Sequence, residues 1–346
     1  MIMPDCSQKE QTYFIGANTK NGFVGFGDEI FKDTGKIYII KGGPGTGKST
    51  FMRNVCAEAQ KRGYTVKKYL CSSDPSSLDA VVIDELSLAF TDGTSPHILE
   101  GRYIGACENY LDFGLFWNRD FLHECLDEIK EISLIKKESF SSLYRLIKAA
   151  SVITDERSFM LDKCFDKEKS DKAAMRLLSP FGQGSGFSLH THQISAFGMN
   201  GSQMLPTYET MANYKIGIAD KRSLAPSVFN SIIKAAEVLK LKTYISYDIF
   251  LKPNALFFPE KALSVSVLGD DKIINTERFL LSEAYSKNRS KIRFLNSLTE
   301  DIISLCSYEW QKIKESHFAL ESIYSSSMDF DALNSFCSHI IEENII

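Results

Sequence analysis

A glycine-rich segment near the start of the chain constrains its fold more than any other feature. Residues 42–49 read GGPGTGKS and fit the phosphate-binding (Walker A) pattern G-x-x-x-x-G-K-[ST]. The apolar residues 37–40 before it predict a buried parallel strand, and residues 49–62 after it predict a helix that ends at Gly63. A strand, a phosphate loop and a helix in this order indicate an α/β fold.

The residue types of this loop suit a nucleoside triphosphate. Glycines let the backbone curl so that successive N–H groups point inward, and the helix N-terminus adds the positive end of its dipole. Pro44 has no N–H to donate, so residues 45–50 are expected to form the cradle. Lys48 would reach the β- and γ-phosphates, and the Ser49 hydroxyl would bind Mg²⁺. The predicted nucleotide-binding residues are Gly42, Gly43, Gly45, Thr46, Gly47, Lys48, Ser49 and Thr50.

A catalytic phosphate loop also needs an acid near the Mg²⁺ at the end of a neighbouring strand. Residues 81–83 form one apolar run, which ends in Asp84 and Glu85, and another apolar run precedes Asp92. At the carboxyl end of a strand, each acid would face the crevice where ligands of open α/β sheets bind. We predict that Asp92 associates with the metal and that Glu85 activates water. Because the chain contains no N-K-x-D string, ATP is favoured over GTP.

The second half of the chain repeats the first half at a constant offset. This offset places Ile40 on Ile218 and the string Ser49-Thr-Phe51 on Ser227-Val-Phe229. The identities follow the same order of expected strands and helices, so the sequence predicts a duplicated unit.

The loop of the second copy has lost the phosphate-binding pattern. Residues 220–227 read DKRSLAPS, with Pro226 in place of the lysine and no glycine. Such a loop is not expected to curl its N–H groups around a triphosphate. A remaining possibility is that Lys221 or Arg222 donates a positive charge to the first site across a domain interface.

Each α/β unit is followed by a stretch with helical patterning, over about residues 118–178 and about residues 276–345. A second alignment matches Phe165-Asp166 with Phe330-Asp331, so the duplication includes these arms, and antiparallel helix pairs are expected. Residues 180–187 are rich in glycine and predict a domain boundary. The predicted fold is therefore α/β, with duplicated P-loop NTPase-like parallel sheets flanked by helices. The phosphate-loop domain would cover residues 1–180 and the degenerate copy residues 188–346.

Composition excludes several function classes. The 346 residues carry a net charge of −4 with no block of basic residues, which argues against a nucleic-acid partner. The eight cysteines contain no C-x-x-C pair, which is typical of reduced thiols in a cytoplasmic protein. No apolar run approaches the roughly 18 residues that span a bilayer, so no membrane contact is expected. A homo-oligomer or a protein partner remains possible.

Three strings carry a resemblance to known proteins: KGGPGTGKSTFM at the loop, the block over residues 71–97, and ESIYSSSMDF over residues 321–330. Together they resemble a family of poorly characterised bacterial ATP-binding proteins built from two P-loop halves. The resemblance implies a two-domain ATPase in which Lys48 and Ser49 hold nucleotide and metal. It also implies that the site is lined by Asp74, Glu85, Asp92 and His97. The chain departs from the family pattern, which keeps a glycine-rich loop in both halves.

The sequence leaves three hypotheses for function. The first is Mg²⁺-dependent ATP hydrolysis that drives or locks the arrangement of the two halves. The second is a kinase, for which Arg102 and Arg119 are the nearby candidates for an arginine that contacts the transferred phosphate. The third is a nucleotide sensor without turnover, in which the degenerate half provides a surface for a partner. His97 is a candidate contact for phosphate or substrate in the enzymatic hypotheses.

Overall fold

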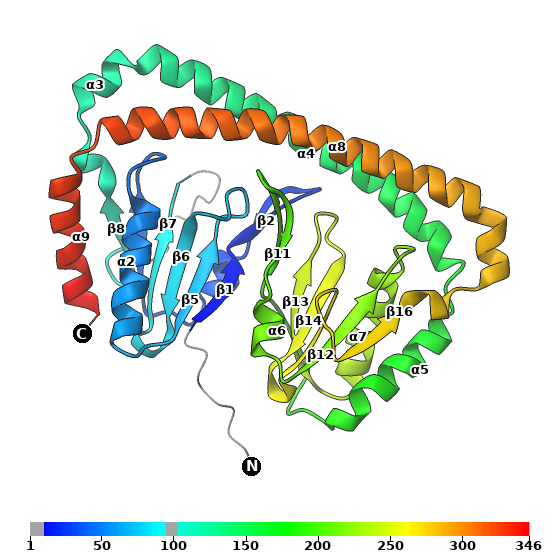
Figure 1. Ribbon diagram of the computed structural model, residues 1–346. Coiled ribbons are helices and arrows are strands. Elements are labelled where there is room, and N and C mark those ends of the chain that lie inside the picture. The colour runs from blue at the N-terminus through cyan, green and yellow to red at the C-terminus, as the bar shows by residue number, and fades with distance from the viewer. Residues whose placement is uncertain (1–9, 95–102, 346) are drawn as a thin grey trace.

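The structure is a computed structural model that describes residues 10–94 and 103–345 (Figure 1). The first of its two larger sheets has the strand order β1-β5-β6-β7-β4-β8. Strand β4 is the predicted strand before the glycine-rich loop, and its central residues are buried, as the apolar run indicated. The strands are β1 (Glu10–Phe14), β4 (Lys36–Lys41), β5 (Val66–Leu70), β6 (Leu78–Ile83), β7 (Leu88–Asp92) and β8 (Glu108–Asp112).

The prediction of parallel sheets is wrong for one strand of each sheet. Strand β4 pairs in parallel with β7 and β8, and β1 pairs in parallel with β5, but β6 is antiparallel to both of its neighbours. The cause is the short connection over residues 71–77, because a parallel crossover needs a dozen or more residues. The sheet is therefore mixed.

The second large sheet repeats the first, with the order β16-β12-β15-β14-β13-β9. Its strand β14 is again antiparallel to both neighbours. The alignment that places Ile40 on Ile218 also places Lys36, the start of β4, on Tyr214, the start of β12, so the predicted offset is confirmed. The strands are β9 (Ser188–Thr191), β12 (Tyr214–Ala219), β13 (Lys242–Tyr247), β14 (Pro253–Phe258), β15 (Leu263–Ser266) and β16 (Lys272–Asn275).

Smaller elements follow the same duplication. Each unit has an antiparallel hairpin, a short helix and a main helix, in the same order along the chain, and the main helix follows the strand one in from the sheet edge, β4 or β12. In the first unit these are β2 (Gly16–Thr19), β3 (Gly22–Gly25), α1 (Gly27–Ile30) and α2 (Lys48–Lys61). In the second they are β10 (Ser195–Gly198), β11 (Gly201–Met204), α6 (Thr207–Met211) and α7 (Ala225–Val238). Between the two sheets lies a shared apolar core that includes Tyr13, Ile194, Tyr208 and Phe257.

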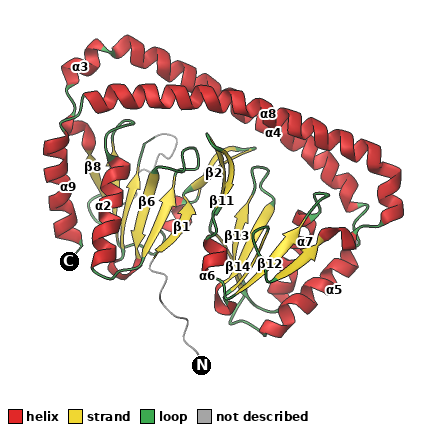
Figure 2. Cartoon of the chain, viewed as in Figure 1, coloured by secondary structure: helices red, strands yellow, loops and turns green. Residues whose placement is uncertain are grey.

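Two long helices lie side by side across one end of both sheets, as Figures 1 and 2 show. They are α4 (Leu126–Asp162), which follows the short α3 (Arg119–Glu124), and α8 (Ser282–Ser326). Ser142 in the middle of α4 bonds to Glu309 in the second half of α8, whereas Glu156 near the end of α4 bonds to Lys291 early in α8, so the helices are antiparallel. The pair, called the roof below, thus takes one helix from each half of the chain.

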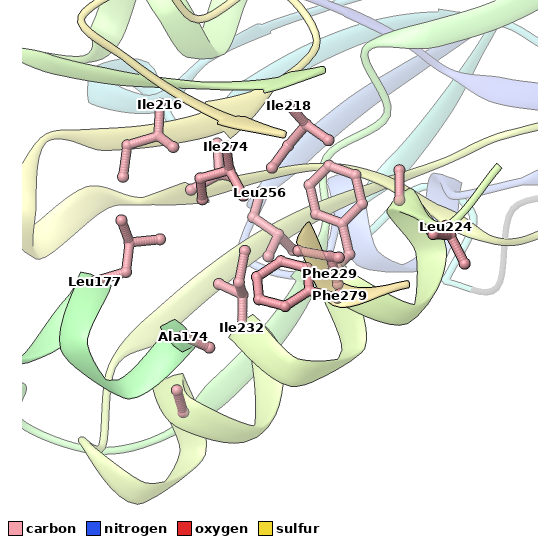
Figure 3. Close-up of a cluster of buried hydrophobic side chains, with 14 of the residues drawn as sticks. Ala174, Leu177, Ile216, Ile218, Leu224, Phe229, Ile232, Leu256, Ile274 and Phe279 are labelled. Atoms are coloured by element: carbon pink, nitrogen blue, oxygen red, sulfur yellow. The ribbon is translucent and has the colours of Figure 1, made fainter. Parts of the chain in front are cut away.

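The two units exchange their last helices. Helix α5 (Lys167–Leu178) belongs to the first half of the chain but packs on α7 of the second unit. Figure 3 shows Ala174 and Leu177 of α5 directed toward Ile232 of α7 and the strand residue Ile216. Helix α9 (Phe330–Asn344) makes the reciprocal crossing, because its buried residues Leu333, Cys337 and Ile340 join the core of the first unit. A division at residue 180 separates the sheets but assigns α5 to the wrong sheet.

The alignment of the helical arms also needs a correction. Asp166 caps α5 by accepting the Lys169 N–H, and Asp329 caps α9 by accepting the Ala332 N–H. Asp329 is therefore the structural equivalent of Asp166, whereas the sequence alignment matches Asp166 with Asp331, two positions further along. The sequence alignment followed the Phe-Asp pair that occurs in both segments, at residues 165–166 and 330–331, whereas the aspartate that caps α9 lies just before its Phe-Asp pair.

Candidate functional site

The glycine-rich loop (residues 42–49) connects the carboxyl end of β4 to the start of α2, as the sequence predicts. Gly45 has φ of +70° and Gly47 has φ of +84°, in the left-handed region that favours glycine. The loop therefore turns sharply before the helix begins at Lys48. The N–H groups in the first turn of a helix have no carbonyl partner within that helix, so this turn is suited to an anion.

Lys48 is only 8% exposed, and its side chain reaches back over the loop. Its ammonium group donates to the carbonyl oxygens of Gly42 at 2.9 Å and Gly43 at 2.6 Å. The Nζ atom also lies 3.6 Å from Oδ2 of Asp92. Asp92 ends β7, which pairs directly with β4, and its Oδ1 accepts both the N–H and the hydroxyl of Thr94. The structure thus brings the predicted lysine and the predicted acid together.

Ser49 ties the loop to the first residue of the antiparallel strand. Its hydroxyl oxygen accepts the Leu78 N–H at 2.9 Å. This contact holds the start of β6, and not its end, beside the glycine-rich loop. The direction of β6 therefore decides which acids can reach the site.

The direction of β6 contradicts the predicted role of Glu85. Because β6 runs antiparallel to β7, Asp84 and Glu85 lie at the opposite edge of the sheet from the loop. There Asp84 pairs with Lys67, and Glu85 accepts the Thr65 N–H at 3.0 Å. Burial alone would raise the pKa of Glu85, but this hydrogen bond and others lower it overall. Glu85 is a surface ion that caps a turn, far from Lys48.

The same direction places a different acid in the site. Asp79, the second residue of β6, is 4% exposed and lies on the side of the sheet edge that holds the loop. Asp74, which the family resemblance indicates, is nearby in the connection before β6 and accepts the N–H and hydroxyl of Ser76. Sequence reasoning missed Asp79 because it treated β6 as parallel. The length of the connection over residues 71–77 was the signal that could have identified it.

These residues line one cavity of about 990 Å³. All eight predicted nucleotide-binding residues between Gly42 and Thr50 line its wall, and so does Pro44. The cavity continues from the loop up to the roof, which contributes side chains from both long helices. The acids and bases around it are Lys48, Arg53, Asp74, Asp79, Asp92, Lys136, Lys137, His317 and Glu321.

The roof places two nitrogen bases opposite the loop. Nζ of Lys136 on α4 lies 3.1 Å from Nδ1 of His317 on α8. Burial lowers the pKa of Lys136, and the charge of Lys48 lowers it further. Burial and then the charge of Lys136 lower the pKa of His317 to about 4, so the imidazole is neutral at pH 7. The neutral ring therefore accepts a hydrogen bond from the ammonium group.

The far side of the loop is packed against α8. A Cβ atom at Gly45 would lie 2.5 Å from the carbonyl oxygen of Glu321, and one at Gly43 would lie 3.0 Å from the ring of Tyr324. Two of the loop's glycines thus permit close approach of a helix as well as an unusual turn. Besides residues of α8 and Phe330 of α9, the second half of the chain contributes Met199, which follows β10.

In the second unit a carboxylate of the chain occupies the position of a bound anion. Oδ1 of Asp220 accepts the Leu224 N–H and Oδ2 accepts the Ala225 N–H, both at 2.9 Å, at the start of α7. The Thr276 hydroxyl donates to the same carboxylate at 2.7 Å. An internal anion therefore already uses the N-terminus of α7, which agrees with the prediction that this loop does not bind phosphate.

Arg222 does not reach the first site. Its guanidinium donates to Glu277 at 2.7 Å and to the Tyr285 hydroxyl at 2.8 Å, within the second unit. The hypothesis that Arg222 donates a charge across the interface is wrong for this arrangement. Arg119 begins α3 and is not among the residues that line the cavity. His97 and Arg102 lie outside the residues that the structure describes.

Metal clusters and membrane spans are both absent from residues 10–94 and 103–345. No group of three or more histidine, cysteine, aspartate or glutamate side chains there is arranged to hold a metal ion. Within the same residues, no helix combines the length and the apolar character that a bilayer span requires, although the roof helices are long.

Comparison with known proteins does not assign a family or a function to this chain. No family model, no curated protein and no solved structure matches the chain.

Proposed function

We propose that the cavity binds Mg·ATP on the glycine-rich loop and hydrolyses it, and that the nucleotide sets the arrangement of the roof over the two units. One observation carries the proposal: Nζ of Lys48, the first residue of α2, lies 3.6 Å from Oδ2 of Asp92, the last residue of β7. A cation, an acid and a set of inward N–H groups in one cavity are what a triphosphate with its metal requires.

Each group has a role in binding. Lys48 would exchange the carbonyl oxygens of Gly42 and Gly43 for oxygens of the β- and γ-phosphates, which are stronger acceptors for an ammonium group. The Ser49 hydroxyl and the Asp92 carboxylate are oxygen ligands of the kind that Mg²⁺ prefers. When bound, the Mg²⁺ would neutralise phosphate charge during transfer to water.

The proposed coupling rests on the packing of the loop. Its glycines touch Glu321 and Tyr324 of α8, and α8 runs across both units. A nucleotide that reshapes the loop must therefore change its contacts with the roof. The second unit, whose own loop is occupied by Asp220, would receive this change through the two long helices.

The test is release of inorganic phosphate from ATP by the full-length protein with Mg²⁺, together with ATP affinity by calorimetry. We expect Lys48→Ala to weaken ATP binding and Asp92→Asn to lower turnover by about 10²-fold or more, the order expected for the loss of one transition-state contact. Glu85→Gln is the matched control, because it removes a carboxylate at the other edge of the same sheet. Its turnover should equal that of the wild type.

Several results would count against the proposal in different ways. No ATP binding by the wild type would refute it entirely. Tight binding without phosphate release would refute hydrolysis and favour a nucleotide sensor. Phosphate transfer that requires an added acceptor would favour a kinase. Equal turnover in the wild type and Lys48→Ala would show that any phosphate release comes from another site.

A further inference from the structure

The pair formed by Lys136 and His317 differs from the other contacts between the roof helices. Elsewhere a donor on one helix meets an oxygen acceptor on the other, as for Ser142 with Glu309 and Lys291 with Glu156. Lys136 instead meets a ring nitrogen, 3.1 Å away. Among the residues that the structure describes, Lys136 has no carboxylate within ion-pair distance. The roof thus holds a half-buried cation whose direct partner carries no negative charge.

This pair occurs where the roof closes the cavity over the glycine-rich loop. Lys136 and His317 both line the cavity that Lys48 and Asp92 line from below. Burying a cation without a partner is unfavourable, and an anion that enters the cavity relieves this cost. The charges of Asp74 and Asp79 raise the pKa of His317, and the charge of Glu321 raises the pKa of Lys136, but each effect is smaller than that of burial.

The ammonium group has the capacity for a second acceptor. It carries three N–H donors, and the bond to His317 uses one of them. The imidazole accepts and brings no charge of its own, so it fixes the ammonium position and leaves the positive charge available. An acid at position 317 would fix the same position but neutralise the charge.

We propose that Lys136, positioned by the His317 imidazole, donates to the terminal phosphate of the bound nucleotide, so that the roof distinguishes a triphosphate from a diphosphate. This inference rests on the proposed function, because it assigns the roof side of the same site. It replaces the arginine that sequence reasoning sought in the second unit with a lysine from α4. Lys136 is then the residue that links the presence of the γ-phosphate to the roof.

The test compares affinities for ATP and ADP, each with Mg²⁺, by calorimetry on the full-length protein. Losing a hydrogen bond to a charged group should weaken ATP binding of Lys136→Met by about 10-fold to 100-fold, and ADP binding by less than about threefold. Lys136→Arg should restore most of the preference for ATP. The control is Lys148→Met, which removes an exposed lysine from the same helix and should change neither affinity.

His317 has a separate test, because its expected role is to position Lys136. His317→Gln keeps an acceptor for the ammonium group and should retain the preference for ATP, whereas His317→Leu should lose part of it. If Lys136→Met does not fold by circular dichroism, Lys136→Gln takes its place.

The outcomes separate this inference from the proposed function. Wild-type protein that binds no ATP overturns both. Wild-type protein that prefers ATP, with equal weakening of ATP and ADP in Lys136→Met, overturns only the role of Lys136, because general charge or packing then explains the loss. The role of Lys136 is likewise overturned if Lys136→Met keeps the wild-type ratio of ATP affinity to ADP affinity.

Discussion

The substitution Gly45→Ala tests the contact between the glycine-rich loop and α8. Gly45 has φ of +70°, and an added Cβ would lie 2.5 Å from the Glu321 carbonyl oxygen and 2.8 Å from its Cγ. The variant therefore combines two costs. The left-handed backbone costs an alanine about 1–2 kcal/mol. The clash is with backbone of a long helix, so it cannot be relieved by turning a side chain.

Gly22→Ala separates these two costs. Gly22 has φ of +89° in the turn of the β2–β3 hairpin, and nothing lies within 4 Å of its added Cβ. Gly22→Ala should lose only the free energy that a left-handed backbone costs an alanine, about 1 kcal/mol of unfolding free energy. Gly45→Ala should lose a further 1–3 kcal/mol, roughly the cost of overpacking a well-packed site.

The assay is urea denaturation of both variants beside the wild type, with the m-value checked for each. ATP affinity measured on the folded variants provides a second readout, and it should fall for Gly45→Ala but not for Gly22→Ala. If the two variants lose the same stability within about 0.5 kcal/mol, the typical range of a neutral surface change, the packing of α8 on the loop is refuted.

Three further predictions concern the second unit and pH. Asp220→Ala should destabilise the protein by about 1–3 kcal/mol in urea, because it leaves N–H groups of α7 without an acceptor, with ATP affinity unchanged. Arg222→Met should leave ATP turnover unchanged, and a tenfold loss would restore its role at the first site. Burial, first among the causes, lowers the pKa of His192 to about 3 and that of His317 to about 4, from 6.5. Below pH 6.5 these two rings are therefore protonated in the unfolded chain but stay neutral in the folded chain until the pH falls to their lowered pKa. Stability should fall as the pH drops from 6.5 toward 4, by up to about 1.4 kcal/mol per unit for each ring. His192→Phe should lose less stability between pH 7 and pH 5 than the wild type, and an equal loss would contradict this assignment.

Local patterns predicted the loop and its flanking elements. The strand before Gly42 and the helix after it appear within one residue of their expected bounds, because apolar spacing and glycines act over a few residues. Asp92 was also placed correctly, since β7 is parallel to β4 and ends at the loop. The same reasoning failed for Glu85, because strand direction depends on a connection and a neighbour, and not on the strand's own residues.

The roof side of the site was not predictable from one sequence. Lys136 and His317 are far apart along the chain, on helices whose pairing is decided by long-range packing. In the sequence each is one polar residue on a long amphipathic helix, where most such residues face solvent. The exchange of α5 and α9 was hidden for the same reason, since an amphipathic helix indicates that one face is buried but not which partner buries it.

The exchange of α5 and α9 has a consequence for how the protein can be made. The core of the first unit includes Leu333 and Cys337, so the strands and helix over residues 10–112 cannot cover their apolar face until residues 330–344 have been synthesised. At roughly 5–20 residues per second, this unit would wait about ten seconds or more with its core open on the ribosome. The second unit has no such delay, because α5 precedes it. The half of the chain made later is therefore the half able to complete its core first.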